Sequence, residues 1–138
     1  MIVTKKYLNE LTYRIIGCAI EVHKNLGPGL LESVYHKCFL FELEMKNLLY
    51  TQQKNVPIKY KEYEIAAELR YDVLVENLII VELKSVDGIL PIHQAQLLTY
   101  MKLLGKPKGV LLNFNCLNIF KEGQRTIVND LFSVLPDE

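Results

Sequence analysis

Two carboxylates and one ammonium group converge in the pattern of residues 71–84. This segment predicts two apolar strands joined by a short turn around Asn77. Folding the segment about Asn77 brings Asp72 opposite Glu82, because each lies five residues from that centre. Glu82 and Lys84 are two residues apart, so they lie on the same face of their strand. The sequence therefore predicts a small patch of sheet that carries two acids and a lysine.

This triplet is suited to metal-assisted hydrolysis of a phosphodiester. Facing carboxylates repel each other unless positive charge lies between them, and Mg²⁺ or Mn²⁺ accepts oxygen ligands of this kind. The backbone carbonyl of Leu83 could add a further ligand. A lysine beside the metal can orient or activate water and stabilise charge on phosphate. The alternative is a surface ion pair, in which Lys84 neutralises Glu82 and Asp72 is an exposed acid near a turn.

Four further runs of sequence agree in order and spacing with one known family. They are Gly29–Tyr35 (GLLESVY), Val81–Ser85 (VELKS), Pro91–Tyr100 (PIHQAQLLTY) and Leu112–Asn115 (LNFN). The chain resembles the GxxExxY family, a branch of the PD-(D/E)XK nuclease superfamily, from about residue 13 to 129. The resemblance implies an α/β fold with a restriction-endonuclease-like αβββαβ core, in which helices flank a mixed central sheet. It also implies an active site of the Mg²⁺ type.

Glu32 opens the second predicted helix and has two interpretations. As a carboxylate in the first helical turn, it can cap amides and complement the helix dipole. The resemblance implies a second role, as an acid that supports the metal site from the first core helix. His23 and His36 have no partners at ligand spacing, and we interpret both as structural or surface residues.

A third predicted helix places His93, Gln96 and Tyr100 on one face, at positions i, i+3 and i+7. The resemblance implies that Gln96 and Tyr100 contact the site and the backbone of a nucleic acid, with His93 as a further candidate. The alternative is that Tyr100 is a core aromatic residue, Gln96 a solvated residue and His93 a helix-start residue.

Apolar periodicity and turn residues predict the remaining elements. Helices are expected over 8–26, 30–48 and 92–104, and strands over 52–60, around Arg70 and Asp72, over 78–84 and over 108–114. A closing hairpin is expected from segments 117–120 and 125–128, with its turn at 122–123.

Composition bounds the class of protein. A chain of 138 residues, half of them apolar, predicts one nuclease-like domain over 1–138 with a sizeable core. The formal net charge of zero argues against a strongly electropositive nucleic-acid binder. The three cysteines form no C-x-x-C pair, which disfavours a zinc or iron–sulfur site. No signal peptide or membrane-length apolar run is seen, so a cytoplasmic location is expected.

Two functions of different classes follow. The first is a Mg²⁺- or Mn²⁺-dependent nuclease acting on DNA, or on RNA. The second is a non-catalytic module that keeps the nuclease-like fold and binds nucleic acid or protein. Small size and neutral charge favour the module, whereas the intact Asp72, Glu82 and Lys84 favour the enzyme. A homodimer or an unidentified protein partner would enlarge the binding footprint, for which Lys102, Lys106 and Lys108 are the best local cluster of phosphate contacts.

Overall fold

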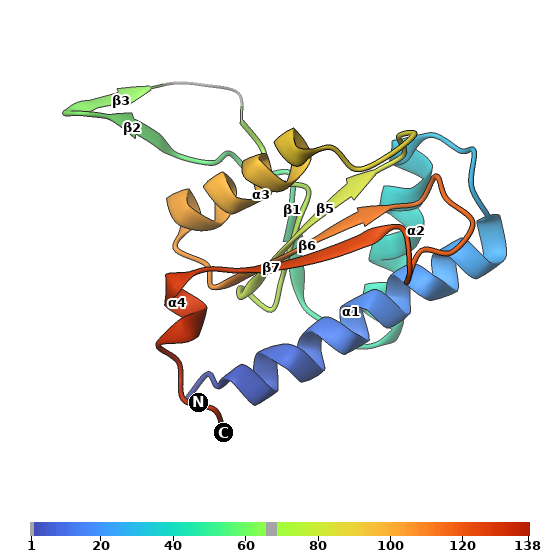
Figure 1. Ribbon diagram of the computed structural model, residues 1–138, viewed down its shortest axis with the longest axis horizontal. Coiled ribbons are helices and arrows are strands. Elements are labelled where there is room, and N and C mark those ends of the chain that lie inside the picture. Colours follow the sequence, from blue (N-terminus) through green and yellow to red (C-terminus); the bar gives the residue numbers. More distant parts are fainter. Residues whose placement is uncertain (1, 66–68) are drawn as a thin grey trace.

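A mixed five-stranded sheet forms the centre of the structure, a computed structural model that describes residues 2–65 and 69–138. The elements in chain order are α1 (Lys5–Leu26), α2 (Glu32–Met45), β1 (Tyr50–Gln52), β2 (Ile58–Tyr60), β3 (Tyr63–Ile65), β4 (Val73–Val75), β5 (Ile79–Lys84), α3 (Pro91–Leu104), β6 (Lys108–Asn113), β7 (Gln124–Val128) and α4 (Asp130–Ser133). The sheet has the order β1-β4-β5-β6-β7, and β2 and β3 form a separate hairpin that projects from the body (Figure 1). The predicted fold class is confirmed.

Helices cover both faces of the sheet, because the strands are apolar on both sides. Alternate residues such as Val81 and Leu83 join the core formed with α1 and α2. The intervening residues, such as Ile80 and Leu111, pack with α3. Close approach of α3 requires glycine at position 109, where a Cβ atom would lie 2.8 Å from the side chain of Leu97. Glu82 and Lys84 belong to the side of β5 that α3 covers only in part.

The register of the central strands follows from one tight turn and one crossover. Three residues, 76–78, separate the paired Val75 and Ile79, and the first two of them, Glu76 and Asn77, are left-handed with φ angles of 52° and 58°. The turn pairs β4 with β5 antiparallel, with Val73 opposite Val81. After α3 the chain returns as β6, which pairs parallel to β5.

Two predicted strands are wrong. Segment 52–60 is not one strand, because β1 ends at Gln52 and β2 begins at Ile58. Gln53 has a φ of 48°, and Pro57 has no amide to donate, so both interrupt a continuous ladder. Segment 117–120 is not a strand: it leads into a turn in which the amide of Gly123 donates to the carbonyl of Ile119, and β7 pairs with β6 instead.

No helix within the described residues combines the length and the apolar character that crossing a membrane would require.

Candidate active site

Two hydrogen bonds join Asp72 to the Glu82–Leu83 segment at the point where the β4–β5 ladder ends. The amide of Asp72 donates to Glu82 Oε2 at 2.7 Å, and the amide of Leu83 donates to Asp72 Oδ2 at 2.7 Å. Each carboxylate therefore binds the main chain of the opposite strand, as the turn about Asn77 requires. The bonds engage one oxygen of each acid and fix the two carboxylates side by side.

Neither acid forms a direct ion pair with any residue that the structure describes. Glu82 is only 4% exposed, and burial followed by the negative charge of Asp72 raises the pKa of Glu82 to about 8. Burial also raises the pKa of Asp72, although the Leu83 amide and the charge of Lys84 oppose this. Within residues 2–65 and 69–138, the only salt bridge joins Lys5 to Asp137. Lys84 therefore influences the acids without forming the surface ion pair of the alternative interpretation.

The first turn of α2 brings a third acid to the same site. Burial and the charge of Asp72 raise the pKa of Glu32, whereas Lys84 and His36 lower it. A hollow of about 470 Å³ separates α2 from the sheet edge and is lined by Glu32, Ser33, His36, Lys37, Leu40, Gln52, Gln53 and Asp72. Glu32 therefore faces the site from the first turn of α2, a placement that both of its interpretations allow.

His36 is a residue of the site that the sequence analysis set aside. Its Nε2 lies 2.8 Å from Oε1 of Gln52, and its ring is almost fully buried beside Glu32 and Asp72. The signal was the four-residue spacing from Glu32, which places both side chains on one face of α2. Spacing to other histidines or cysteines could not reveal it, because its neighbours are carboxylates and an amide from other elements.

Helix α3 contributes a tyrosine beside the acids. Burial, Glu82 and Asp72, in that order, raise the pKa of Tyr100, whose hydroxyl oxygen accepts a hydrogen bond from Gln96 Nε2 at 3.2 Å. At the start of the helix, His93 Nδ1 accepts the amide of Leu90 at 3.0 Å. The structure thus brings Tyr100 and Gln96 to the site, while His93 has the geometry of a helix-start residue.

The acids fit a divalent cation as a two-carboxylate site. In the part of the chain that the structure describes, no group of three or more His, Cys, Asp or Glu side chains is arranged to hold a metal ion. Oδ2 of Asp72 and Oε2 of Glu82 accept main-chain amides, which leaves Oδ1 and Oε1 as anionic donors. Carboxylate oxygens with added water are the ligands that Mg²⁺ prefers.

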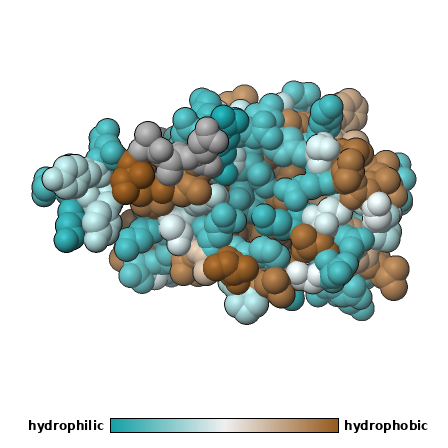
Figure 2. All heavy atoms as spheres, turned by 90° about the horizontal axis from the view of Figure 1, so that it is seen from above, coloured by the Kyte–Doolittle hydropathy of each residue, from teal (hydrophilic) through white to brown (hydrophobic). Residues whose placement is uncertain are grey.

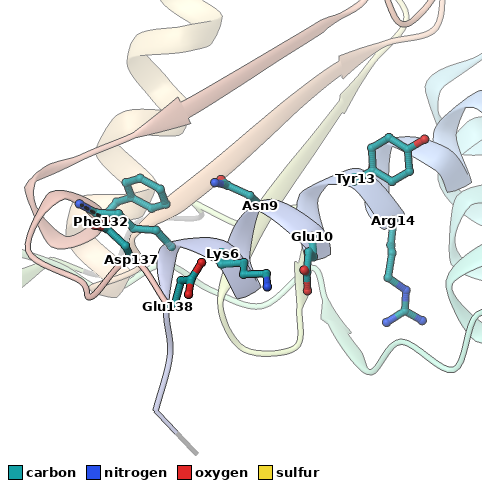
Figure 3. Close-up of a pocket in the computed structure, with 9 residues that line it drawn as sticks. Lys6, Asn9, Glu10, Tyr13, Arg14, Phe132, Asp137 and Glu138 are labelled. Carbon is teal, nitrogen blue, oxygen red and sulfur yellow. Dashed lines mark ion pairs between the residues drawn. The ribbon is translucent and has the colours of Figure 1, made fainter.

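A larger hollow, of about 690 Å³, lies elsewhere and lacks this chemistry. It forms where the C-terminal tail docks on α1, and Lys6, Glu10, Arg14 and Asp137 are among its lining residues (Figure 3). Main-chain carbonyls of the tail accept the first amides of α1. Charges of both signs are mixed along its exposed wall, so it does not concentrate charge of one sign.

Comparison with known proteins gives one match. A family model described as the PD-(D/E)XK nuclease superfamily matches residues 9–126, a span that contains Glu32, Asp72, Glu82, Lys84 and Tyr100. No curated protein and no solved structure matches the chain.

Proposed function

The chain belongs to the PD-(D/E)XK nuclease superfamily, and we propose that it is a metal-dependent nuclease that hydrolyses phosphodiester bonds in DNA, or in RNA. The observation that carries this proposal is the pairing of buried Glu82 with Asp72 in the absence of a direct cation partner among the described residues. Two adjacent buried acids disfavour each other's ionisation, and a bound cation relieves that cost. The motif at 29–35 assigns the chain, within this proposal, to the GxxExxY branch.

Each side chain has a role in this proposal. Asp72 and Glu82 hold Mg²⁺ or Mn²⁺, with the main-chain carbonyl of Leu83 as a further donor. When bound, the metal supplies a Lewis acid and lowers the pKa of water. Lys84 orients the attacking water and stabilises negative charge on the phosphate. Glu32 accepts hydrogen bonds from water at the mouth of the site.

Helix α3 supplies the substrate contacts of the proposal. Gln96 and Tyr100 orient the strand at the site, and their mutual hydrogen bond fixes both side chains. His93 is the weakest member of this set, because its ring nitrogen Nδ1 already accepts the amide of Leu90.

Affinity and assembly follow from charge. We propose that residues 1–138 act as one domain and that the isolated domain binds nucleic acid weakly, since its formal net charge is zero. Self-association or a protein partner would add phosphate contacts without any new residue type.

A second candidate function is a non-catalytic module that binds nucleic acid or protein. It is favoured by the zero net charge and by the finding that no three-ligand metal cluster exists within the described residues. The enzyme needs a divalent cation, whereas the module does not.

Metal binding tests the choice between them. We expect the wild-type protein to bind Mn²⁺ at millimolar concentration by calorimetry and to cleave a labelled oligonucleotide. Glu82→Gln and Asp72→Asn should lose both properties and keep the fold. Glu10→Gln is the matched control, because Glu10 is an exposed acid on the other hollow. If the wild type binds no Mn²⁺, with or without nucleic acid, the catalytic proposal fails and the module is preferred.

A further inference from the structure

The β2–β3 hairpin carries all of its apolar side chains on one face. Ile58 lies opposite Ile65, and Tyr60 lies opposite Tyr63, whereas the intervening pair joins a lysine to a glutamate. Directly opposite residues share a face in an antiparallel pair, and the next pair points the other way. The hairpin is therefore amphipathic, with two isoleucines and two tyrosines on one side.

Three of the four side chains on this apolar face are exposed. Tyr60 is 60% exposed, Tyr63 is 73% exposed and Ile65 is 46% exposed. The two strands pack mainly on each other, and the hairpin forms a narrow projection at one end of the molecule (Figure 2). A two-stranded ribbon alone is marginally stable in water, and exposed apolar patches mark interaction sites, so these aromatic residues indicate a binding surface.

The projection is an extension of the strand pair that carries Asp72. Beyond β1 and β4, the amide of Gln53 donates to the carbonyl of Asp72 at 3.0 Å, and Val56 donates to Leu69 at 2.7 Å. Val56 and Leu69 also pack in the cluster that contains Tyr100. Segments 53–56 and 69–72, which pair with each other beside the candidate active site, thus lead toward the hairpin on the α3 side of the sheet.

The size of the face argues against a second copy of the chain. Its exposed tyrosines and isoleucine offer about 400 Å², given some 200 Å² for each large side chain. A stable protein interface needs about 800 Å² from each partner. The hairpin face alone is therefore too small to hold a dimer together.

Its chemistry fits unpaired bases. Every base has a π-face that stacks on an exposed tyrosine ring, and lysines beside the ring reach the phosphates. The Lys61 ammonium lies 5.5 Å from the centre of the Tyr60 ring. Lys54, Lys59 and Arg70 are further exposed basic residues of the hairpin and of the segments that lead into it.

We propose that the β2–β3 hairpin docks a single-stranded stretch of nucleic acid, with bases stacked on Tyr60 and Tyr63. The inference rests on the proposed function and narrows its substrate to nucleic acids with an unpaired segment, because the segments that lead to the hairpin pair with each other beside Asp72. The hairpin binds the strand, and the acids cleave it nearby.

A tryptophan reporter tests the contact directly. The chain contains no tryptophan, so Tyr60→Trp creates a single reporter at the hairpin. We expect a single-stranded oligothymidylate of about 16 nucleotides to quench its fluorescence in a saturable way, in buffer without divalent metal. Tyr13→Trp, at a position 79% exposed on α1, is the matched control and should show no saturable change. Equal quenching at both positions, or none at position 60, overturns the inference.

Alanine and phenylalanine variants separate stacking from other roles. Changing both Tyr60→Ala and Tyr63→Ala should weaken oligonucleotide binding by about tenfold or more, while the two Tyr→Phe changes should preserve it. Tyr13→Ala should bind as the wild type does. Wild-type affinity in the alanine variant refutes the proposal. Tighter binding of a blunt duplex than of the single strand would show that the face contacts a groove of duplex DNA instead. A wild-type dimer that dissociates in the alanine variant would show that the face binds a second copy of the chain.

Binding and cleavage fail independently in this design. Hairpin-dependent binding without Mn²⁺-dependent cleavage sinks the proposed function and leaves the hairpin inference standing. Mn²⁺-dependent cleavage that is equally fast in the alanine variant refutes the hairpin inference and leaves the proposed function standing.

Discussion

Glu82 and Lys108 are both 4% exposed, on adjacent parallel strands, yet a second carboxylate lies beside Glu82 whereas neutral groups surround Lys108. Lys108 opens β6, where its Nζ donates to Asn9 Oδ1 at 2.7 Å and lies 5.3 Å from the centre of the Phe132 ring. Asn9 and Phe132 line the hollow between α1 and the C-terminal tail (Figure 3). Glu82 lies toward the other end of β5, where a second carboxylate is its neighbour.

The difference separates a structural charge from a candidate reactive one. Burial lowers the pKa of Lys108, and a neutral oxygen and an aromatic face meet its ammonium without a counter-ion. Asp72 adds to the effect of burial on Glu82, so the native environment itself disfavours the ionised acid. A site that stays unfavourable in the folded protein gains most from a ligand of opposite charge.

The largest predicted effect is the loss of cleavage when Glu82, the candidate reactive charge, is replaced. Glu82→Gln keeps the size of the side chain but removes an anionic donor, so cleavage should fall by at least about 100-fold. Lys108→Met, at the structural charge, should leave the rate within about threefold of wild type. Initial rates on one labelled oligonucleotide in Mn²⁺ compare the two variants. Equal losses in both would show that burial alone, and not the paired acids, explains the requirement.

Lys84→Ala should lower the rate by about ten- to 100-fold while preserving Mn²⁺ affinity, because a group that stabilises developing charge contributes a few kcal/mol to the barrier. Calorimetry and single-turnover cleavage on the same sample measure the two properties. Retention of near wild-type cleavage by Lys84→Ala would remove this lysine from the mechanism, provided that Glu82→Gln is inactive in that assay.

The strand pairing around Asn77 could be predicted because it depends on local sequence. A short turn and period-two alternation fix the register of β4 and β5, and the apolar run of residues 78–84 indicates a central strand. The placement of Lys108 could not be predicted in this way. Its partners come from α1 and the C-terminal region, so a lysine expected to contact phosphate with Lys102 and Lys106 is instead buried.

The same limit applies to His36 and to segment 52–60. His36 joins the site through contacts with Gln52 and the nearby acids, which bring together α2, β1 and the end of β4. The break in segment 52–60 depends on a left-handed Gln53, a conformation that the residue type alone does not demand. The placement of His36 and the break in segment 52–60 therefore depend on tertiary packing, which local periodicity does not reveal.

Folding stability tests the structural role of Lys108. Lys108→Ala leaves Asn9 Oδ1 without its donor and removes the packed methylene stem, so the free energy of unfolding should fall by about 1–3 kcal/mol. Lys108→Met keeps the stem and removes the buried charge, so its loss should be smaller. Urea unfolding of both variants gives the two values. Equal losses in the two variants would show that the ammonium, and not the packed stem, accounts for the stabilisation.

The two buried charges should also differ in the sign of the pH dependence that each gives to folding stability. Glu82 has a folded-state pKa of about 8 against an ordinary value of 4.5, so the folded protein binds more protons than the unfolded chain between these values. The contribution of Glu82 to the free energy of unfolding is therefore fully present below about pH 4.5. It is lost as pH rises through 8, by at most about 1.4 kcal/mol per pH unit. Lys108 has a lowered pKa, so the unfolded chain binds more protons and stability rises as pH approaches 10.5.

Urea unfolding of the metal-free protein at several pH values measures both slopes. Glu82→Gln should flatten the fall between about pH 5 and 8, and Lys108→Met should flatten the rise at higher pH, each without changing the other. Mn²⁺ should reduce the fall in the wild type, because a bound cation favours the ionised acids. A wild-type stability that rises between pH 5 and 8 would contradict the raised pKa of Glu82, and the contrast between the two buried charges would then lose its electrostatic basis.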